Sequence, residues 1–118
     1  MEKVFDCLLP IKTISEANTR DHWTKGYKRH KLQKMWIRAT FQGQINKIIT
    51  PCHVILTRYG RKMDDDNLIS ALKYVRDEIA SQIKPGLAPG KADEGEDITW
   101  EYKQKAQNKV ELRIEIFQ

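Results

Sequence analysis

The sequence predicts a small α+β domain in which a mixed β-sheet packs against two helices, in the chain order β-α-β-α-β-β. Two observations carry this prediction. Apolar residues recur at helical spacing in two long segments, and the C-terminal segment alternates strictly between apolar and polar residues. A chain of 118 residues is long enough to bury one core, so we expect residues 1–118 to form a single domain.

The first half of the chain predicts one strand and one helix. Residues 4–9 (VFDCLL) form a short apolar run that stops at Pro10, which is typical of a strand. A polar loop follows, and helical spacing then extends from about Thr24 to Phe41.

Two stripes follow this predicted helix on different sides. The apolar stripe has the spacing i, i+3, i+4, i+7 and consists of Leu32, Met35, Trp36 and Ala39. The basic stripe consists of Lys31, Lys34 and Arg38. We expect the helix to pack through the apolar stripe and to offer the basic stripe to a partner.

The second half predicts a strand, a helix and two further strands. Residues 52–59 (CHVILTRY) are rich in β-branched and aromatic side chains. A helical repeat then covers about residues 66–83, with apolar positions at Leu68, Leu72, Val75, Ile79 and Ile83. After a loop rich in Pro and Gly, residues 98–104 (ITWEYKQ) and 109–117 (KVELRIEIF) indicate two strands. Because few residues separate them, we expect these strands to pair as a hairpin.

Composition excludes some classes of protein and favours others. No apolar run approaches the roughly 20 residues that a membrane-spanning helix needs, and the N-terminus does not resemble a signal peptide. We therefore expect no membrane partner. Cys7 and Cys52 lie in apolar, strand-like surroundings, so we expect buried free thiols and a cytoplasmic location.

The charge of this basic chain, +5 in total, is unevenly distributed. Between Arg20 and Arg38 there are seven Lys or Arg residues and one acid, whereas the segment from Asp93 to Glu101 contains five acids and no base. Such a division suits a protein that attracts a polyanion with one region and holds cations with another. The alternative is that each segment is simply a solvated surface.

Three consecutive acids, Asp64, Asp65 and Asp66, precede the second predicted helix. Helix capping is one explanation, because Asp is a preferred N-cap residue and acids in the first turn complement the helix dipole. Capping uses one side chain, however, and adjacent carboxylates repel each other unless a cation neutralises them. At the end of an extended strand, Asp64 and Asp66 would point to the same side. Two such carboxylates with open water positions suit Mg²⁺.

A second acidic group precedes the third predicted strand and consists of Asp93, Glu94, Glu96 and Asp97. If that strand lies beside the one that ends at Tyr59, the two acidic groups could meet at one end of the sheet. Carboxylates from different elements would then hold Mg²⁺ for phosphodiester hydrolysis. The spacing of the acids excludes an EF-hand, and no Cys/His cluster has the spacing of a zinc site.

The motif Asp64-x-Asp66-Asn67-Leu68 at a strand-to-helix turn has basic residues before it and an acidic pair after a Gly/Pro loop. The N-terminal stretch LPIKTISEANTRDHW and the strand ITWEYKQ accompany it. Together these features resemble the RusA family of Holliday junction resolvases, especially its phage and prophage members. The resemblance covers most of the chain.

This resemblance implies a Mg²⁺-dependent endonuclease that resolves four-way DNA junctions as a homodimer, by paired nicks in opposing strands. The family's carboxylates map onto Asp64 and Asp66, and its later acidic pair maps onto Asp93 and Glu94. Because the family usually has Asp-Asp at that pair, Asp97 is a further candidate for the third ligand.

The resemblance also assigns roles to basic residues. The family has a functional lysine where this chain has Ser70, so Lys73, one turn further along the helix, is the candidate for that catalytic role. Arg61 and Lys62, just before the motif, are candidates for phosphate contacts. With DNA as the substrate, we expect the basic stripe of Lys31, Lys34 and Arg38 to guide duplex arms. Two other functions stay open: a non-catalytic DNA-binding protein whose aspartates cap a helix, and an interaction protein whose acidic loop binds a basic partner.

Overall fold

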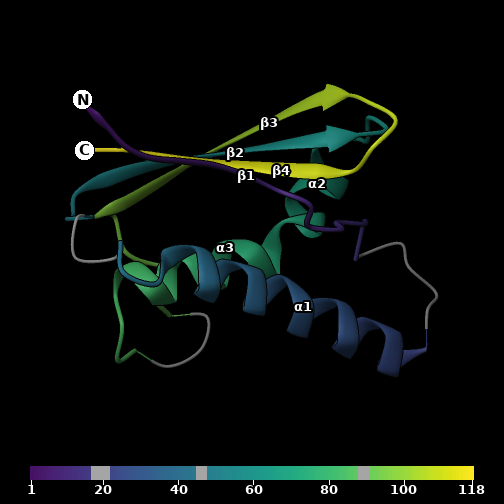
Figure 1. Ribbon diagram of the computed structural model, residues 1–118, viewed down its shortest axis with the longest axis horizontal. Helices are drawn as coiled ribbons and strands as arrows, with labels where there is room; N and C mark the ends of the chain where they lie inside the picture. The colour runs from purple at the N-terminus through teal and green to yellow at the C-terminus, as the bar shows by residue number, and fades with distance from the viewer. Residues whose placement is uncertain (17–21, 45–47, 88–90) are drawn as a thin grey trace.

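The described part of the chain folds into a four-stranded sheet and three helices (Figure 1). This computed structural model describes residues 1–16, 22–44, 48–87 and 91–118. The α+β class with a mixed sheet, predicted from the sequence, is confirmed. In chain order the elements are β1 (Lys3–Leu9), α1 (Trp23–Phe41), β2 (Cys52–Gly60), α2 (Asp65–Ala71), α3 (Lys73–Ile83), β3 (Ile98–Ala106) and β4 (Glu111–Phe117).

The strands lie in the spatial order β1-β4-β2-β3. β2 is parallel to β3, with Cys52 opposite Ile98 and Gly60 opposite Ala106, whereas β4 is antiparallel to both β1 and β2. The predicted hairpin of β3 and β4 is therefore wrong, because β2 lies between them. The short connection after β3 instead passes the end of β2, where the backbone N–H of Gln107 donates to the carbonyl oxygen of Gly60.

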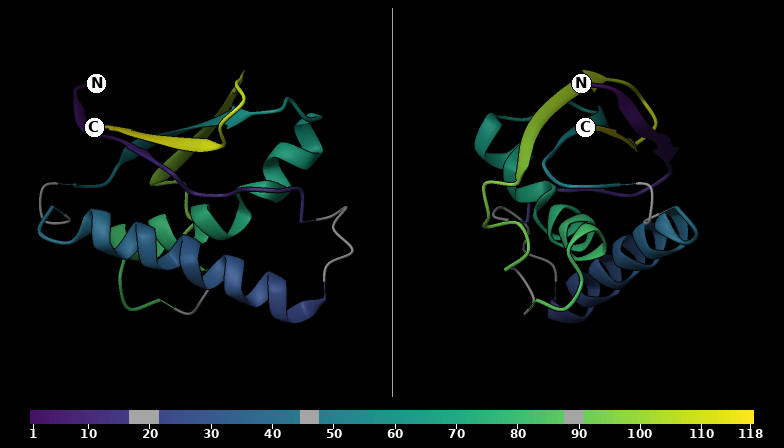
Figure 2. Two further views of the ribbon diagram at one scale, coloured as in Figure 1. Left: turned by 45° about the vertical axis from the view of Figure 1, so that its right-hand side comes forward. Right: turned by 90° about the vertical axis from the view of Figure 1, so that its left-hand side faces the viewer.

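The core lies between one face of the sheet and the helices α1 and α3 (Figure 2). Both layers contribute fully buried side chains, among them Ile37, Phe41, Val54, Leu56, Leu72, Val75, Ile79, Leu112, Ile114 and Ile116. The other face of the sheet carries ion pairs between neighbouring strands. Arg113 on β4 pairs with Asp6 on β1 at 2.7 Å, and Lys3 pairs with Glu115 at 2.8 Å. The sheet thus buries apolar residues on one face and matches charges on the other.

α1 packs through a different stripe from the one that the sequence predicted. Its buried residues are Gln33, Ile37 and Phe41, and the ring of Phe41 stacks on that of Phe5 with centroids 4.6 Å apart. The four residues of the predicted apolar stripe, Leu32, Met35, Trp36 and Ala39, are exposed instead.

Polar contacts on the buried stripe give a physical reason for this orientation. The side-chain amide of Gln33 donates to the carbonyl oxygen of Lys12 at 2.8 Å. One turn earlier, the ring of His30 stacks on that of Tyr74 of α3 at 3.6 Å between centroids. These contacts satisfy part of the polar surface that the stripe buries, although the side-chain oxygen of Gln33 has no donor in the described residues.

The second predicted helix is two helices that meet at Leu72. There the backbone leaves the helical region, with φ −102° and ψ 3°, and the Leu72 N–H donates to the carbonyl oxygens of both Leu68 and Ile69. The prediction of one continuous helix is wrong, although its apolar face is confirmed because Leu68, Leu72, Val75 and Ile79 are all buried. The break changes the direction of the chain (Figure 2) while both segments keep their apolar residues in the core.

Cys7 and Cys52 are free thiols, the first half-buried and the second buried. Burial raises the pKa of the Cys7 thiol to about 11, and it also raises the pKa of Cys52. Both groups are therefore protonated near neutral pH and poor nucleophiles. No α-helix in the described residues has both the length and the apolar character needed to span a membrane.

Candidate functional site

The acidic turn, Asp64 to Asp66, joins β2 to α2. Asp64 is the N-cap of α2, and its carbonyl oxygen accepts the first helical hydrogen bond, from Leu68 N at 2.9 Å. Its side chain makes no capping hydrogen bond. Asp65 and Asp66 already belong to the first turn of the helix, so the extended-strand geometry expected for Asp64 and Asp66 does not hold.

A buried cation lies next to this turn. Arg58 near the end of β2 is only 5% exposed, and burial lowers the pKa of its guanidinium. The guanidinium donates to the hydroxyl and the carbonyl oxygen of Thr13, at 2.8 and 3.1 Å, and to the carbonyl oxygen of Arg61 at 2.8 Å. Gly60 makes room for it, because a Cβ there would lie 3.1 Å from Nη1 of Arg58. Arg58 therefore ties the start of the turn to the segment that follows β1.

Two further side chains hold the acidic turn in place. The side-chain amide of Gln104 on β3 accepts from the N–H of Met63 at 3.1 Å and donates to its carbonyl oxygen at 2.8 Å. The hydroxyl of Ser15 donates to the side-chain oxygen of Asn67 at 2.8 Å. The turn is thus fixed from β2, from β3 and from the segment after β1.

The carboxylates on this turn are exposed and unneutralised. In the described part of the chain, no hydrogen bond or ion pair joins the side chain of Asp64, Asp65 or Asp66 to another residue. Three adjacent negative charges on a fixed turn repel each other, and a bound cation would relieve that repulsion.

The second acidic segment, Asp93 to Asp97, is different because three of its four acids are paired with cations. Asp93 accepts from Nε of Arg76 at 3.0 Å. Glu94 and Asp97 form ion pairs with Lys91 and Lys84, at 3.5 and 3.1 Å. Each candidate for the third metal ligand therefore already has a positively charged neighbour.

The structure does not bring the two acidic segments together at one end of the sheet. Because β2 and β3 are parallel, the acidic turn follows the last residue of β2 whereas Asp93 to Asp97 precede the first residue of β3. The two segments thus lie at opposite ends of neighbouring strands, and the conditional prediction that they meet is wrong. No three Asp, Glu, His or Cys side chains among the described residues are gathered as a metal site.

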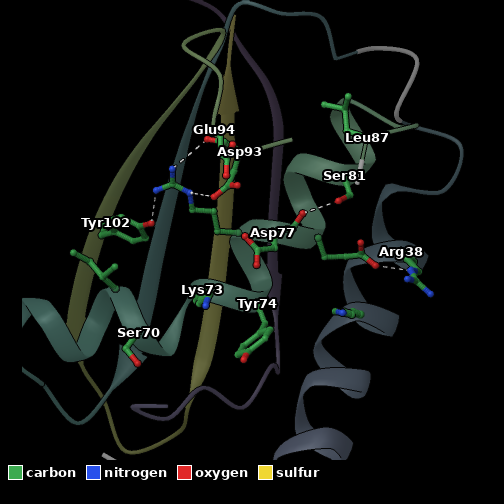
Figure 3. A pocket seen from close by; sticks show the side chains of 14 residues that line it. Arg38, Ser70, Lys73, Tyr74, Asp77, Ser81, Leu87, Asp93, Glu94 and Tyr102 are labelled. Carbon is green, nitrogen blue, oxygen red and sulfur yellow. Dashed lines mark hydrogen bonds and ion pairs between the residues drawn. The ribbon is translucent and has the colours of Figure 1, made fainter. Parts of the chain in front are cut away.

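A cleft of about 810 Å³ lies between α1, the α2–α3 segment and the second acidic segment (Figure 3). Ser70 and Lys73 line it toward one end, and Asp93 and Glu94 toward the other. Asp64 and Asp66 are not among the described residues that line it. Asp66 is nevertheless one helical turn before Ser70, so the two lie on the same side of α2.

The cleft contains functional candidates that the sequence did not reveal. Arg76 donates to Asp93 and, at 2.8 Å, to the hydroxyl of Tyr102, and its guanidinium lies 4.7 Å from the ring centre of Trp100. Burial, and then the negative charge of Asp93, raise the pKa of the Asp77 carboxyl. In the sequence, only the i, i+4 spacing of Lys73 and Asp77 could have indicated Asp77 as a candidate.

The predicted DNA-contacting residues lie in two places. Lys31, Lys34 and Arg38 follow one side of α1; Lys34 and Arg38 line the cleft, and Arg38 forms an ion pair with Glu78 of α3. Arg61 and Lys62 are exposed just before the acidic turn. The predicted DNA contacts thus come from two different elements, and only those on α1 line the cleft.

The donor set of the acidic turn fits a hard divalent cation. Asp64 and Asp66 offer carboxylate oxygens that neither cap the helix nor pair with a cation in the described residues. Mg²⁺ is often bound through one or two carboxylates, with water completing its octahedral shell. A set of three carboxylates that includes Asp93 would require that side chain to leave Arg76.

No protein-family model matches this sequence, and a comparison with curated proteins gives no significant match.

Proposed function

We propose that this protein is a Mg²⁺-dependent endonuclease that cuts branched DNA, including four-way junctions. The observation that carries the proposal is the acidic turn, where three exposed carboxylates are held in place without a neutralising partner in the described residues. Helix capping does not account for Asp64, because its side chain makes no capping bond. The resemblance of the motif around Asp66 to the RusA family supports the same proposal.

In this proposal Asp64 and Asp66 hold the metal, and Asp93 or Glu94 remains the candidate for a third ligand. When bound, Mg²⁺ would lower the pKa of a water molecule and neutralise charge on the scissile phosphate. The chain's own carboxylates fix the position at which this chemistry takes place, because Arg58, Gln104 and their partners immobilise the turn.

Basic side chains would bind the DNA around that position. Lys73, which is exposed on the wall of the cleft, would contact a phosphoryl oxygen and stabilise the negative charge of the transition state. Arg61 and Lys62 would contact the backbone beside the acidic turn, and Lys31 and Lys34 would guide a duplex arm along α1. Arg38 contributes less, because Glu78 already neutralises it.

The proposed reaction sets requirements for assembly and location. Paired nicks in opposing strands of a junction need two active sites, so we propose that the protein acts as a homodimer. It would act on DNA in the cytoplasm, where Cys7 and Cys52 stay reduced.

The test is a nicking assay on a synthetic four-way junction and a linear duplex, each with and without Mg²⁺. We expect the wild type to nick the junction only when Mg²⁺ is present. Asp66→Asn should lower the rate by about 100-fold or more, the scale on which loss of one electrostatic stabiliser acts. Asp65→Asn is the matched control, since it removes the same charge one residue away, and it should stay within a few-fold of wild type.

Two outcomes would contradict the proposal. Junction nicking that survives Asp66→Asn would remove this turn from the active site. Junction binding without any nicking, equally strong in wild type and Asp64→Asn, would instead indicate a non-catalytic DNA-binding protein.

A further inference from the structure

A second cavity, which the proposed nuclease chemistry does not use, lies beside α1. It is a groove of about 480 Å³ between the helix and residues 10–12, the segment that follows β1. Lys34, on the wall of the cleft, and Trp36, on the wall of this groove, are two positions apart on α1 and so project about 200° apart. α1 therefore forms a ridge with the cleft on one flank and the groove on the other.

The groove has an apolar wall and a polar floor. Leu32 and Trp36 form the wall, and both are substantially exposed, at 58% and 41%. Gln33, at the floor, is 2% exposed. Its amide nitrogen donates to Lys12 O, while its side-chain oxygen is a buried acceptor with no donor in the described residues. A buried acceptor without a donor is unfavourable, and a shift of the Gln33 side chain toward the groove would let a ligand N–H satisfy it.

Positive charge surrounds the groove. Lys12, Lys25 and Lys28 line it and are exposed, and no acid is among its described lining residues. Arg29 also lines it, but that guanidinium is paired with Glu16 at 2.7 and 2.8 Å. The free charge near the groove is therefore that of three lysines, which suits an anionic ligand with a flat apolar part.

We propose that this groove binds one unstacked nucleotide of a DNA strand. The base would stack on Trp36, an N–H group on its edge would donate to the side-chain oxygen of Gln33, and the flanking phosphates would contact Lys12, Lys25 and Lys28. Stacking on aromatic side chains combined with basic contacts to the backbone is the general mode of single-strand binding. The inference rests on the proposed function, because a branch point is where a duplex exposes unstacked bases.

The two sides of α1 would then bind different parts of the DNA. Phosphates on the side of Lys34 enter the cleft, and a base on the side of Trp36 enters the groove. A fully stacked duplex could fill the first but not the second. The groove would thereby favour branched DNA over linear duplex without contact with the scissile phosphate.

The test measures binding of the full chain to fluorescently labelled single strands in EDTA, so that metal and cleavage play no part. One strand is oligo-deoxyadenosine, and the other has abasic sites in its central positions. We expect the wild type to bind the first about 10-fold more tightly, the effect of stacking one base. Trp36→Ala should abolish this ratio. Met35→Ala, which truncates an exposed side chain outside the groove, should leave the ratio unchanged.

Two further measurements separate the contacts. Replacing the adenines by purine, which lacks the amino group, should weaken binding of the wild type several-fold if Gln33 accepts from that group. Lys28→Ala should weaken binding of both strands equally and lower the salt dependence by about one phosphate contact. Equal affinity for the normal and abasic strands, or a ratio that Trp36→Ala preserves, would overturn the proposal.

The same variants distinguish other occupants and other failures. If sedimentation shows a dimer that Trp36→Ala converts to a monomer, a second copy of the chain covers the groove and the proposal is wrong. Base-dependent binding without any nicking activity would overturn the nuclease but not the groove. Nicking without base-dependent binding would overturn the groove proposal but not the nuclease.

Discussion

The two acidic segments of this protein have similar sequences and different surroundings. Asp93, Glu94 and Asp97 each lie beside a lysine or arginine, so their charges are matched within the fold. Asp64, Asp65 and Asp66 have no such partner in the described residues, although Arg58, Gln104 and Ser15 hold their turn in place. The second acidic segment has the features of a structural ion-pair cluster, and the acidic turn has those of a site for a cation.

This difference shows why the number of acids alone is a poor guide to function. Charges that neighbouring residues neutralise stabilise the fold, whereas charges that repel each other on a fixed turn destabilise it until something binds. The acidic turn is therefore the better candidate for function. The predictions below test that contrast, from the largest expected effect to the smallest.

The largest effect should come from neutralising one acid in each of the two segments and comparing the results. Asp66→Asn should lower junction nicking about 100-fold with little loss of stability. Asp93→Asn should instead lower the free energy of unfolding by about 1–2 kcal/mol, because Arg76 loses a charged hydrogen-bond partner. Chemical denaturation and single-turnover nicking, measured on both variants, make the comparison. An unchanged stability with a 100-fold slower reaction in Asp93→Asn would place Asp93 at the metal.

The hydrogen bonds of the buried Arg58 next to the acidic turn should also be sensitive to substitution. Gly60 has φ +151°, and a Cβ there would lie 3.1 Å from the guanidinium of Arg58. Gly60→Ala should therefore destabilise the protein by about 1–3 kcal/mol in urea denaturation. Gly43→Ala is the control, since Gly43 also has a positive φ but nothing within 4 Å of its Cβ position. Equal losses in both variants would mean that only backbone strain matters.

Mg²⁺ should stabilise the protein through the acidic turn. At a concentration ten times its dissociation constant, a ligand that binds only the folded state adds about 1.4 kcal/mol to the free energy of unfolding. We therefore expect Mg²⁺ to raise the Tm of the wild type and of Asp65→Asn. The double variant Asp64→Asn/Asp66→Asn should show none, and should be more stable than wild type without metal because the repulsion is relieved. A Mg²⁺ response that survives in the double variant would place the cation elsewhere.

The smallest effect concerns Asp6, a paired acid on the open face of the sheet. The hydrogen bond from Arg113 lowers the pKa of Asp6 to about 2, with a smaller contribution from Lys3. The stabilisation is therefore fully present above the ordinary pKa of 3.8, and is lost as the pH falls from there toward 2. Urea denaturation should show Asp6→Asn to be slightly less stable than wild type at pH 7, with the gap closing toward pH 2. A gap independent of pH would exclude this ion pair as its cause.

Local periodicity was enough to predict most of the elements. The strands at residues 4–9, 52–59 and 98–104 and the buried face of residues 68–79 follow from the spacing of apolar residues, which depends only on neighbours in the chain. The buried stripe of α1 could not be found in this way, because Gln33 and His30 belong to it. Their contacts with Lys12, Glu16 and Tyr74 form only in the folded chain.

The sequence by itself determined the α+β class, the position of the acidic turn before a helix, and the basic character of α1. Only the tertiary structure decided which strands pair, and hence that the two acidic segments lie at opposite ends of β2 and β3. It also decided which acids are neutralised, since Arg76 and Asp93 are 17 positions apart in the chain and meet only through packing. The physical reason is the same in both cases. Spacing along the chain fixes the local conformation and the side on which a residue lies, whereas charge pairing and strand order depend on contacts between segments that are distant in sequence.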